Sequence, residues 1–524
     1  MNGNGIISWH VRSAITINDF ELELKGEISV KKSFFVLFAV MFMLICSGYG
    51  YAAELTVSTA DGFQDALDTA GSNSEDDTIT LLAGTYKASD VDGGSFGFQQ
   101  TDNSSLTIVG QGNVVLDGEG LRILLIDAGD MEGITIQGIT FQEGYSGNSG
   151  GALEAGISSG KIELKQCAFY DNTSENRGGA AYIRVGAGDV TITGTVFNSN
   201  KGDDSSGALD VGITEGSISL YDNVFSNNES YRNTGAAYLL ISGSTGFIEV
   251  DSCDFTGNRT YGYEAGALWV SSHGEGVLIT NSRFDNNMAE TRGGGAYLSC
   301  ENGFVLVQNC LFSHNSSTRE GAGFYLSSDS YSPEKLTSAD IINNTITGNV
   351  VSGDNYGGGV YVRCGDPDTA YSFYNNIIWG NSADAGADVY LKDERKINSY
   401  SFNISNNDLS VISHDLSEDT DILETANINE DPLFVSPTDY RLQGASPVID
   451  MGDNNAPSLP ESDLDGNARI YGDAVDMGAY EYSSGTGDDD DDDIIGSSSG
   501  CSISALPPIG FILFLPLVFL AKRK

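Results

Sequence analysis

Basic residues are scarce in this chain of 524 residues: Lys and Arg number 26 against 73 Asp and Glu, and the formal net charge is −47. Binding to nucleic acid or to an anionic membrane surface depends on Lys and Arg, so the composition argues against both partners for the folded part of the chain. An acidic exterior instead favours solubility, divalent cations or a salty medium, and all three readings stay open.

Cysteine and histidine are also sparse, with seven and four residues, and no CxxC pair or Cys/His cluster indicates a zinc site. Five cysteines fall in a repeat region, on the side of each predicted strand that faces inward: Cys167, Cys253, Cys300, Cys310 and Cys364. Equivalent cysteines are two or more repeats apart, roughly 9–10 Å, which exceeds the reach of a disulfide. We therefore expect buried thiols that act as small apolar fillers.

Stretches with helical periodicity are rare as well, and proline occurs 10 times whereas glycine occurs 65 times. The apolar residues form short β-branched and aromatic runs broken by Gly, Asn and Ser, which is typical of strands. These runs repeat. Each copy contains a Phe, followed three residues later by an Asn in all copies but the first, at Phe141, Phe169, Phe197, Phe225, Phe255, Phe284 and Phe312.

The phenylalanines are 28, 28, 28, 30, 29 and 28 residues apart, a period typical of a solenoid whose repeats stack to bury their apolar faces. The predicted fold is therefore all-β, a right-handed parallel β-helix. Rungs about 4.8 Å apart place each repeated residue against its own copy. We expect an internal Phe stack, continued by Ile346 and Ile378, and a column of turn asparagines, both of which specify the fold rather than any chemistry.

The flanks of the repeats predict a cap and an export signal. The segment Asp61–Ala70 has helical spacing and is expected to cap the N-terminal end of the solenoid. Two lysines before an apolar run from Phe34 to Ile45, and small residues up to Ala52, indicate a secretory signal that is cleaved after Ala52.

The expected organisation is a series of seven segments. They are residues 1–30, an upstream extension; 31–52, a signal peptide; 53–140, the cap and first rungs; 141–400, the regular repeats; 401–482, the final rungs and a terminal module; 483–500, an acidic Gly/Ser linker; and 501–524, a sorting or anchor segment.

Two parts of the folded region resemble known families. The Phe-x-x-Asn repeat, with Gly-Gly-Ala-aliphatic-Tyr phrases such as Gly178–Tyr182, resembles that of the polymorphic outer-membrane proteins and related bacterial β-helix proteins, from about Phe141 to Asn381. The stretch Asp431–Tyr482 is similar to the choice-of-anchor Q domain along its whole length. The second resemblance implies a surface protein whose solenoid is followed by one of several interchangeable C-terminal anchors.

The C-terminal tail resembles bacterial sorting signals of the small-residue-plus-Cys type. Six aspartates, a Gly/Ser stretch and Cys501 precede an apolar run, Ala505–Ala521, and three basic residues. The resemblance implies processing near Cys501 and transfer to the cell surface. A plain membrane anchor is the alternative, since 17 residues span about 25 Å and the basic end would stay cytoplasmic.

The candidate ligand-binding residues lie on one strand of each repeat, where they alternate with inward apolar residues and so point outward. This tyrosine column reads Glu154, Tyr182, Asp210, Tyr238, Trp269, Tyr297, Tyr325, Tyr361 and Tyr390. Its rings either hold the rungs together or form a platform for a glycan or a protein partner. The ligand-binding prediction rests on Tyr182, Tyr238, Trp269, Tyr297, Tyr325 and Tyr361, whose rings we expect on the surface.

A catalytic pair is the competing interpretation of the same column. Glu154 and Asp210 are two rungs apart, roughly 9–10 Å, at the long edge of the range for an inverting glycosidase. Only Arg184 lies near them in the repeat alignment. We therefore assign no catalytic residue and keep a polysaccharide lyase or glycoside hydrolase as the alternative function.

Two charged patterns complete the candidates. Asp463, Asp465 and Asn467 alternate around Gly466, either as a calcium loop that presents hard oxygen ligands or as an ordinary Asp-Gly turn. Glu264, Arg292 and Glu320 share one repeat position and are expected to form an alternating ion-pair ladder.

The sequence thus predicts an exported bacterial protein, anchored at the cell surface or outer membrane through its C-terminus. It would bind a glycan or a cell-surface partner through the aromatic column, with no cofactor unless calcium occupies the Asp463 loop. The composition and repeats predict no oligomeric state.

Overall fold

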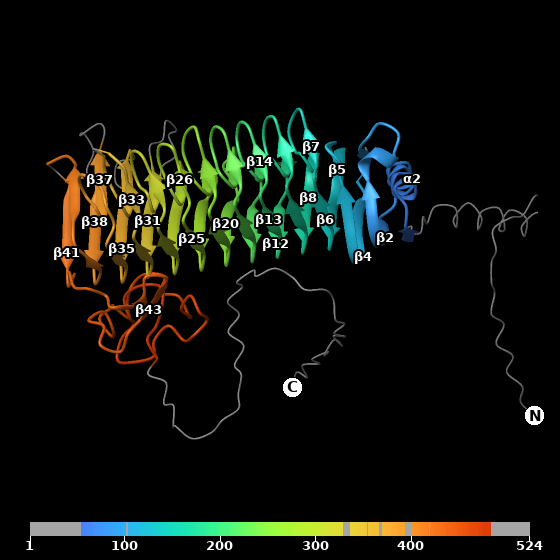
Figure 1. Cartoon of the computed structure of the whole chain (residues 1–524). Coiled ribbons are helices and arrows are strands. Elements are labelled where there is room, and N and C mark those ends of the chain that lie inside the picture. The colour runs from blue at the N-terminus through green and yellow to red at the C-terminus, as the bar shows by residue number, and fades with distance from the viewer. Residues whose placement is uncertain are drawn as a thin grey trace, which may run out of the picture. The chain divides into compact units, whose positions relative to one another are not determined.

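The computed structural model describes residues 54–100, 103–328, 336–353, 355–365, 369–393, 400–418 and 420–483. Parallel strands stack along one axis into a three-faced β-helix, which Figure 1 shows from α2 at the blue end to β41 at the orange end. Each coil of the solenoid contributes a strand segment to the first, second and third face in order. The strands are short because polar loops separate the apolar runs. The predicted all-β solenoid is confirmed.

The first face carries the tyrosine column and contains twelve strands of the described chain. They are β3 (Phe96–Gln100), β5 (Leu124–Gln137), β8 (Leu153–Lys165), β11 (Ala181–Ala187), β15 (Leu209–Glu215), β19 (Ala237–Ile241), β23 (Leu268–Ser272), β26 (Ala296–Cys300), β30 (Phe324–Ser327), β34 (Val360–Cys364), β37 (Val389–Asp393) and β40 (Ile412–Asp415).

The second face follows, and β5 and β8 bend into it without a break. Its further strands are β1 (Glu54–Val57), β2 (Asp77–Lys87), β4 (Ser105–Asp117), β12 (Val190–Thr193), β16 (Ile218–Tyr221), β20 (Phe247–Asp251), β24 (Gly276–Thr280), β27 (Gly303–Gln308), β31 (Leu336–Ile342), β35 (Ala370–Tyr374), β38 (Ser401–Ser405) and β41 (Asp421–Thr425).

The third face carries the phenylalanine stack, and the ends of β2 and β4 belong to it. Its strands are β6 (Thr140–Gln142), β9 (Ala168–Tyr170), β13 (Val196–Asn198), β17 (Val224–Ser226), β21 (Asp254–Thr256), β25 (Arg283–Asp285), β28 (Leu311–Ser313), β32 (Thr345–Thr347), β36 (Ile377–Trp379) and β39 (Asp408–Leu409).

Short two-residue strands lie in the turns that lead from the third face to the first, and they pair in parallel with the strands of neighbouring turns. They are β7 (Tyr145–Ser146), β10 (Thr173–Ser174), β14 (Lys201–Gly202), β18 (Glu229–Ser230) and β22 (Arg259–Thr260), with β29 (Ser316–Ser317) and β33 (Val350–Val351) further on.

The helix α2 (Ala60–Gly71) closes the N-terminal end, as predicted. The side chain of Thr59 caps it by accepting a hydrogen bond from the Gly62 backbone N–H at 3.1 Å. Its apolar side buries Phe63, whose ring lies 4.8 Å from that of Phe96, and thereby covers the open end of the core. A short 3-10 turn (Ala88–Asp90) follows β2.

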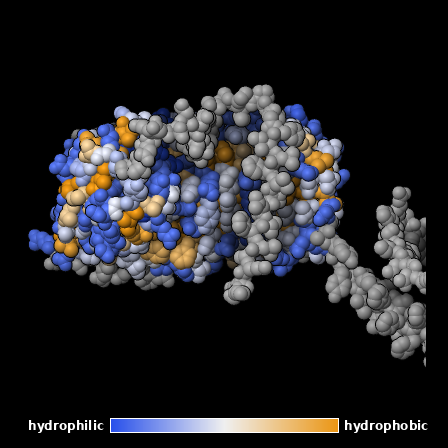
Figure 2. Space-filling model, turned by 90° about the horizontal axis from the view of Figure 1, so that it is seen from below, coloured by the Kyte–Doolittle hydropathy of each residue, from blue (hydrophilic) through white to orange (hydrophobic). Residues whose placement is uncertain are grey.

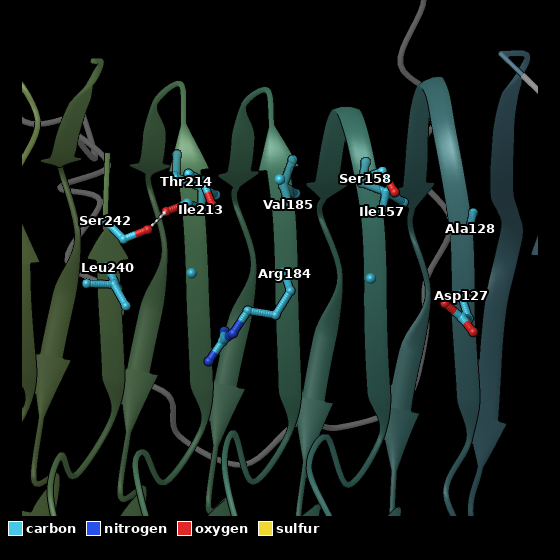
Figure 3. Close-up of a pocket in the computed structure, with 13 residues that line it drawn as sticks. Asp127, Ala128, Ile157, Ser158, Arg184, Val185, Ile213, Thr214, Leu240 and Ser242 are labelled. Atoms are coloured by element: carbon cyan, nitrogen blue, oxygen red, sulfur yellow. Dashed lines mark hydrogen bonds between the residues drawn. The ribbon is translucent and has the colours of Figure 1, made fainter. Parts of the chain in front are cut away.

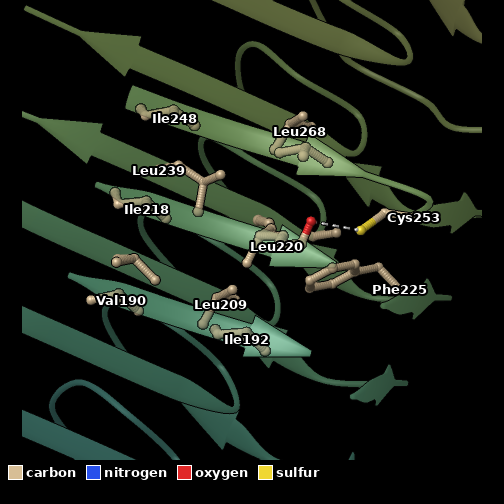
Figure 4. Close-up of a cluster of buried hydrophobic side chains, with 14 of the residues drawn as sticks. Val190, Ile192, Leu209, Ile218, Leu220, Phe225, Leu239, Ile248, Cys253 and Leu268 are labelled. Atoms are coloured by element: carbon tan, nitrogen blue, oxygen red, sulfur yellow. Dashed lines mark hydrogen bonds between the residues drawn. The ribbon is translucent and has the colours of Figure 1, made fainter. Parts of the chain in front are cut away.

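The interior is a continuous apolar core built from the inward residues of all three faces (Figure 4). From Phe141 to Phe312 the phenylalanine rings stack with centroids 4.6–4.9 Å apart and interplanar angles of 2–5°. The five cysteines are buried and are in no disulfide among the described residues, and burial raises the pKa of the Cys253 thiol to about 12. The predicted Phe stack and the burial of the five filler thiols are confirmed.

The column of turn asparagines is present as well. Each side-chain amide nitrogen donates to the side-chain oxygen of the next asparagine at 2.9–3.0 Å, in the order Asn172, Asn200, Asn228, Asn258, Asn287, Asn315, Asn349 and Asn381. The same nitrogen donates to the carbonyl of a stack residue, such as Phe225 for Asn258. The column therefore satisfies backbone groups that the turns remove from the sheets.

The C-terminal module packs on the third face over the last rungs and contains the antiparallel pair β42 (Phe434–Ser436) and β43 (Asp439–Leu442) (Figure 1). Arg469 links the module to the solenoid. Its side chain is 2% exposed, pairs with Glu481 at 3.0 Å and donates a hydrogen bond to the side-chain oxygen of Asn309 at 3.1 Å. The described residues from Glu54 to Tyr482 belong to one compact unit, and the second unit, Ser483–Lys524, lies almost wholly outside the described residues.

Figure 2 shows one side of the molecule, on which hydrophilic residues predominate and hydrophobic residues gather in separate patches. This agrees with the acidic composition of the chain.

Candidate functional site

The tyrosine column lies on the first face in the predicted register. Tyr182 pairs with Glu154 on one side and Asp210 on the other, and the series continues through Tyr238 and Trp269. The residues on either side of each column member point into the core, because side chains alternate along a strand. The column therefore faces away from the core, as the sequence predicts.

The second half of the column forms a tyrosine spine, defined as Tyr297, Tyr325, Tyr361 and Tyr390. Neighbouring rings lie 4.8–5.5 Å apart with interplanar angles of 7–14°. Tyr325 is 2% exposed and Tyr361 is 4% exposed. The prediction that these two rings lie on the surface is wrong, because each ring face is covered by the next ring, and stacked faces cannot receive a ligand.

The first half of the column is open. The rings of Tyr238 and Trp269 meet edge to face at 5.4 Å and 74°, and Trp269 is tilted by 50° from Tyr297. Tyr182, Tyr238 and Trp269 are partly exposed. Burial, and then the charge of Asp210, raises the pKa of the Tyr238 hydroxyl, which therefore stays protonated at neutral pH. The open rings, defined as Tyr182, Tyr238 and Trp269, are the part of the column that a ligand can reach.

Arginines hold both carboxylates of the column. Arg122 pairs with Glu154 at 2.7 Å, and Arg184 pairs with the fully buried Asp210 at 2.5 Å. The Arg184 guanidinium also lies 3.9 Å from the centre of the Tyr182 ring. The two carboxylates are thus ion-pair partners that fix arginines beside the open rings. The sequence alignment missed Arg122 because it precedes the regular repeats.

A shallow groove of about 400 Å³ runs along the same face. Figure 3 shows residues that line it. The groove crosses β5, β8, β11, β15 and β19 and is lined by Asp127, Ala128, Gly156, Ile157, Ser158, Arg184, Val185, Gly186, Gly212, Ile213, Thr214, Leu240 and Ser242.

Glycines form the floor of this groove. Gly156 and Gly212 flank Arg184 in register, two residues beyond the tyrosine column. A Cβ atom at Gly156 would meet no atom within 4 Å, so the space above this strand is open. Arg184 lies across Gly212, where a Cβ atom would come within 3.1 Å of its guanidinium carbon. Glycines at alternate rungs of one outward position are the sequence signal for this groove, which the predicted binding site did not include.

The Asp463 loop has the geometry of an Asp-Gly turn. The Asp463 carboxylate accepts hydrogen bonds from the backbone N–H groups of Asp465, Asn467 and Glu481 at 2.7–3.0 Å. Arg441 binds both carboxylate oxygens of Asp465, at 2.6 and 2.9 Å. Hydrogen bonds from the protein itself thus occupy the carboxylate oxygens of Asp463 and Asp465 that a calcium ion would use. In the part of the chain that the structure describes, no group of three or more His, Cys, Asp or Glu is placed to hold a metal ion.

Other predicted features lie outside the described residues. They are the signal peptide with Ala52, the acidic linker, the sorting segment with Cys501 and the upstream extension. Among the described residues, no helix has the length and apolar character needed to cross a membrane.

One comparison with known proteins, the family model, agrees with the observed architecture. The family model described as right handed beta helix region matches residues 96–284, which confirms the right-handed parallel β-helix. Among solved structures, the A-module of mannuronan C-5 epimerase AlgE6 from Azotobacter vinelandii aligns with a TM-score of 0.38 at 14% identity, covering 74% of this chain and 99% of that one. No curated protein matches the chain. The resemblances to polymorphic outer-membrane repeats, the choice-of-anchor Q domain and sorting signals stay predictions.

Proposed function

We propose that this protein is an exported, surface-anchored β-helix that binds a glycan on its first face, across the groove and the open rings. The observation that carries the proposal is the position of the partly exposed rings of Tyr182 and Tyr238, each two residues before a residue that lines the groove, with Trp269 on the next strand. Tyr and Trp rings offer stiff amphipathic faces to the C–H surface of a sugar, and the hydroxyl, carbonyl and guanidinium groups in the groove supply directional hydrogen bonds.

The groove favours a chain over a single sugar. It is open and crosses several rungs, so a polysaccharide that follows the helix axis would meet equivalent positions about 4.8 Å apart. The acidic surface and the predicted export signal are compatible with work outside the cell, where such polymers occur. The two ion-paired carboxylates favour binding over glycoside cleavage, since neither is a free acid or base.

A glycan array tests this proposal. The purified protein is compared with Tyr238→Ala combined with Trp269→Ala, and with a control that removes two exposed tyrosines elsewhere, Tyr170→Ala with Tyr471→Ala. We expect the first variant to lose its array signals and the control to keep them. The bound glycans are then incubated with the protein and assayed for new sugar ends. Equal binding by all three proteins contradicts the proposed site, and sugar release contradicts a purely binding role.

A further inference from the structure

The turns that lead from the third face to the first carry an unusual series of charges. We call these six the corner turns: Asn172–Gly178, Asn200–Gly207, Asn228–Gly235, Asn258–Gly266, Asn287–Gly294 and Asn315–Gly321. Each contains one basic residue, in the order Arg177, Lys201, Arg232, Arg259, Arg292 and Arg319. The corner strands β7 and β14 mark this edge in Figure 1. Between Phe169 and Gly321 the chain has only two other basic residues, Arg184 and Arg283.

The corner turns therefore differ in charge from the rest of the protein. They contain six basic and seven acidic residues, whereas the rest of the chain contains 20 and 66. The parallel register places successive turns directly against one another, as the pairs of Lys201 with Glu229 and of Glu229 with Arg259 show. The result is a near-neutral ridge along an otherwise strongly acidic solenoid.

Four cations of this ridge form no direct ion pair with a carboxylate among the described residues. Arg232 pairs with Asp204, and Arg292 pairs with Glu264 and Glu320. No ion pair joins Arg177, Lys201, Arg259 or Arg319 to a carboxylate among the described residues, although those residues are rich in Asp and Glu. An unpaired cation on so acidic a surface is available to an external anion.

Exposed tyrosines hold two of these cations. The Lys201 ammonium lies 4.5 Å from the centre of the Tyr231 ring and donates to the Tyr231 hydroxyl at 2.9 Å. The Arg259 guanidinium lies 4.3 Å from the centre of the Tyr261 ring. Tyr231, Tyr261 and Tyr263 are 50%, 40% and 53% exposed. The turn with Tyr261 and Tyr263 is one residue longer than the turn before it, and this extra residue adds aromatic surface to the middle of the ridge.

We propose that the corner turns form a cation ridge that binds a linear anionic polysaccharide running along the helix axis. Each corner turn supplies one cation, at a position that differs from turn to turn, so cations on neighbouring rungs are at least about 4.8 Å apart. An extended sugar chain with one acidic group per ring can place its anions against several of them. Exposed tyrosines can pack against the apolar faces of the same sugars. The ridge lies on turns and the groove lies on the first face, so this proposal does not depend on the proposed function.

The chemistry of the ridge favours a polysaccharide over a nucleic acid. Glu175, Asp203 and Glu229 lie among the cations and would repel a polymer that carries a phosphate on every unit. A uronate or sulfate chain has a lower charge density and offers neutral ring faces between its anions. The shared feature that the ridge recognises is thus one acidic group per sugar, whether carboxylate or sulfate.

Two variants with the same change in net charge test the proposal. The ridge variant combines Arg177→Gln, Lys201→Gln, Arg259→Gln and Arg319→Gln. The control combines Lys87→Gln, Lys161→Gln, Lys165→Gln and Arg441→Gln, which removes four cations that are ion-paired elsewhere. Binding of the full chain to polygalacturonate, dextran sulfate, neutral dextran and single-stranded DNA is measured at low and at physiological salt, after thermal melts establish that both variants fold.

We expect the wild type to bind an anionic polysaccharide, the ridge variant to bind it about tenfold or more weakly, and the control to stay within about twofold of the wild type. Preference for polygalacturonate or for dextran sulfate identifies the acidic group. Equal losses in both variants, no binding to either anionic polysaccharide, or tighter binding to DNA would each overturn the proposal. The Trp269→Ala variant keeps its polyanion binding if the two sites are separate, so failure of the groove and failure of the ridge remain distinguishable.

Discussion

The ladder asparagines show at the residue scale how one side chain can specify a turn. The amide of Asn258 accepts from the backbone and side chain of Asn228 and donates to Asn287 and to the Phe225 carbonyl, and Asn258 is fully buried. The residue before several of these asparagines has a positive φ, for example 53° at Asn227. This backbone conformation is unfavourable for most residues, and the hydrogen bonds of the asparagine side chains stabilise the turn that contains it.

Asn258→Ala should therefore lower the free energy of unfolding by about 3 kcal/mol, since several buried partners lose their hydrogen bonds at about 1–3 kcal/mol each and part of this is recovered by relaxation. Asn148→Ala, at an exposed asparagine of an earlier turn, should change it by less than about 0.5 kcal/mol. Urea unfolding of the two variants measures the difference. Similar costs at both positions would mean that the ladder amides contribute little.

Arg292 tests the predicted charge ladder, which the structure confirms. Its guanidinium lies 3.1 Å from Glu264 and 2.7 Å from Glu320, and all three side chains are partly buried. Arg292→Glu should destabilise the protein more than Arg292→Gln, because it places three like charges in adjacent rungs. The difference should be about 1 kcal/mol and should shrink in high salt. Thermal melts at two salt concentrations provide the measurement, and equal melting of both variants would contradict the ladder.

Asp408 gives the molecule a pH dependence. Burial, together with nearby carboxylates such as Asp388, raises the pKa of its carboxyl to about 7, and one of its oxygens has no hydrogen-bond partner among the described residues. An unfolded aspartate has a pKa of about 3.9. Between about pH 4 and pH 7 the folded state thus holds a proton that the unfolded state has lost, so stability at this site falls as the pH rises through that window.

Asp408→Asn should remove the fall in stability that accompanies ionisation of Asp408, because an amide does not titrate. We expect the variant to be more stable than the wild type at pH 8 and to gain little at pH 4. Urea unfolding at the two pH values measures the change. A stability difference that does not depend on pH would show that Asp408 does not titrate in this range.

Repetition explains which residues could be predicted from the sequence. The Phe stack, the Asn column and the Glu264–Arg292–Glu320 ladder follow from the rule that a repeated residue meets its own copy. Burial of Tyr325 and Tyr361 could not be predicted, because strand alternation gives the direction of a ring and not its tilt. A second asparagine column, Asn344, Asn376, Asn407 and Asn427, was missed because asparagines occupy this position on consecutive rungs only near the end of the solenoid.

The two halves of the tyrosine column have different roles at the scale of the element. Rings in the tyrosine spine cover one another, whereas the open rings are tilted apart. Tyr361→Ala should cost about 3 kcal/mol of stability and leave glycan binding unchanged, because it empties a stacked and buried position. Trp269→Ala should do the reverse, with a loss of binding and a small loss of stability. Denaturation and glycan-binding curves are measured on the same samples of both variants. A loss of binding in Tyr361→Ala with a large loss of stability in Trp269→Ala would contradict the assigned roles.

The C-terminal module is held in place by contacts with the solenoid. Its apolar residues pack on Leu311 and Ile377 of the third face, and the buried Arg469 links it to Asn309. Arg469→Ala would leave Glu481 buried without its partner, at a cost of about 3–5 kcal/mol. We expect limited proteolysis to remove residues 434–482 from this variant faster than from the wild type. Equal cleavage rates would show that Arg469 does not fasten the module.

At the scale of the molecule, the described strands form one continuous stack, so recognition can extend over many rungs. The fold followed from the sequence because its period, strand composition and turn residues all indicate a solenoid. The groove and the cation ridge did not, because they depend on which outward positions of neighbouring rungs come together in space. The acidic composition argued against nucleic acid and anionic membranes as partners, and the corner turns differ from the average composition of the chain.

The most direct test of glycan binding along the axis is a length series. Oligosaccharides of one to eight sugars, prepared from a polymer that the array identifies, are titrated into the protein by calorimetry. We expect affinity to rise steeply with each added sugar and to level off once the chain fills the groove, which crosses five strands. A monosaccharide that binds as tightly as the longest oligomer, or no binding at any length, would contradict the account.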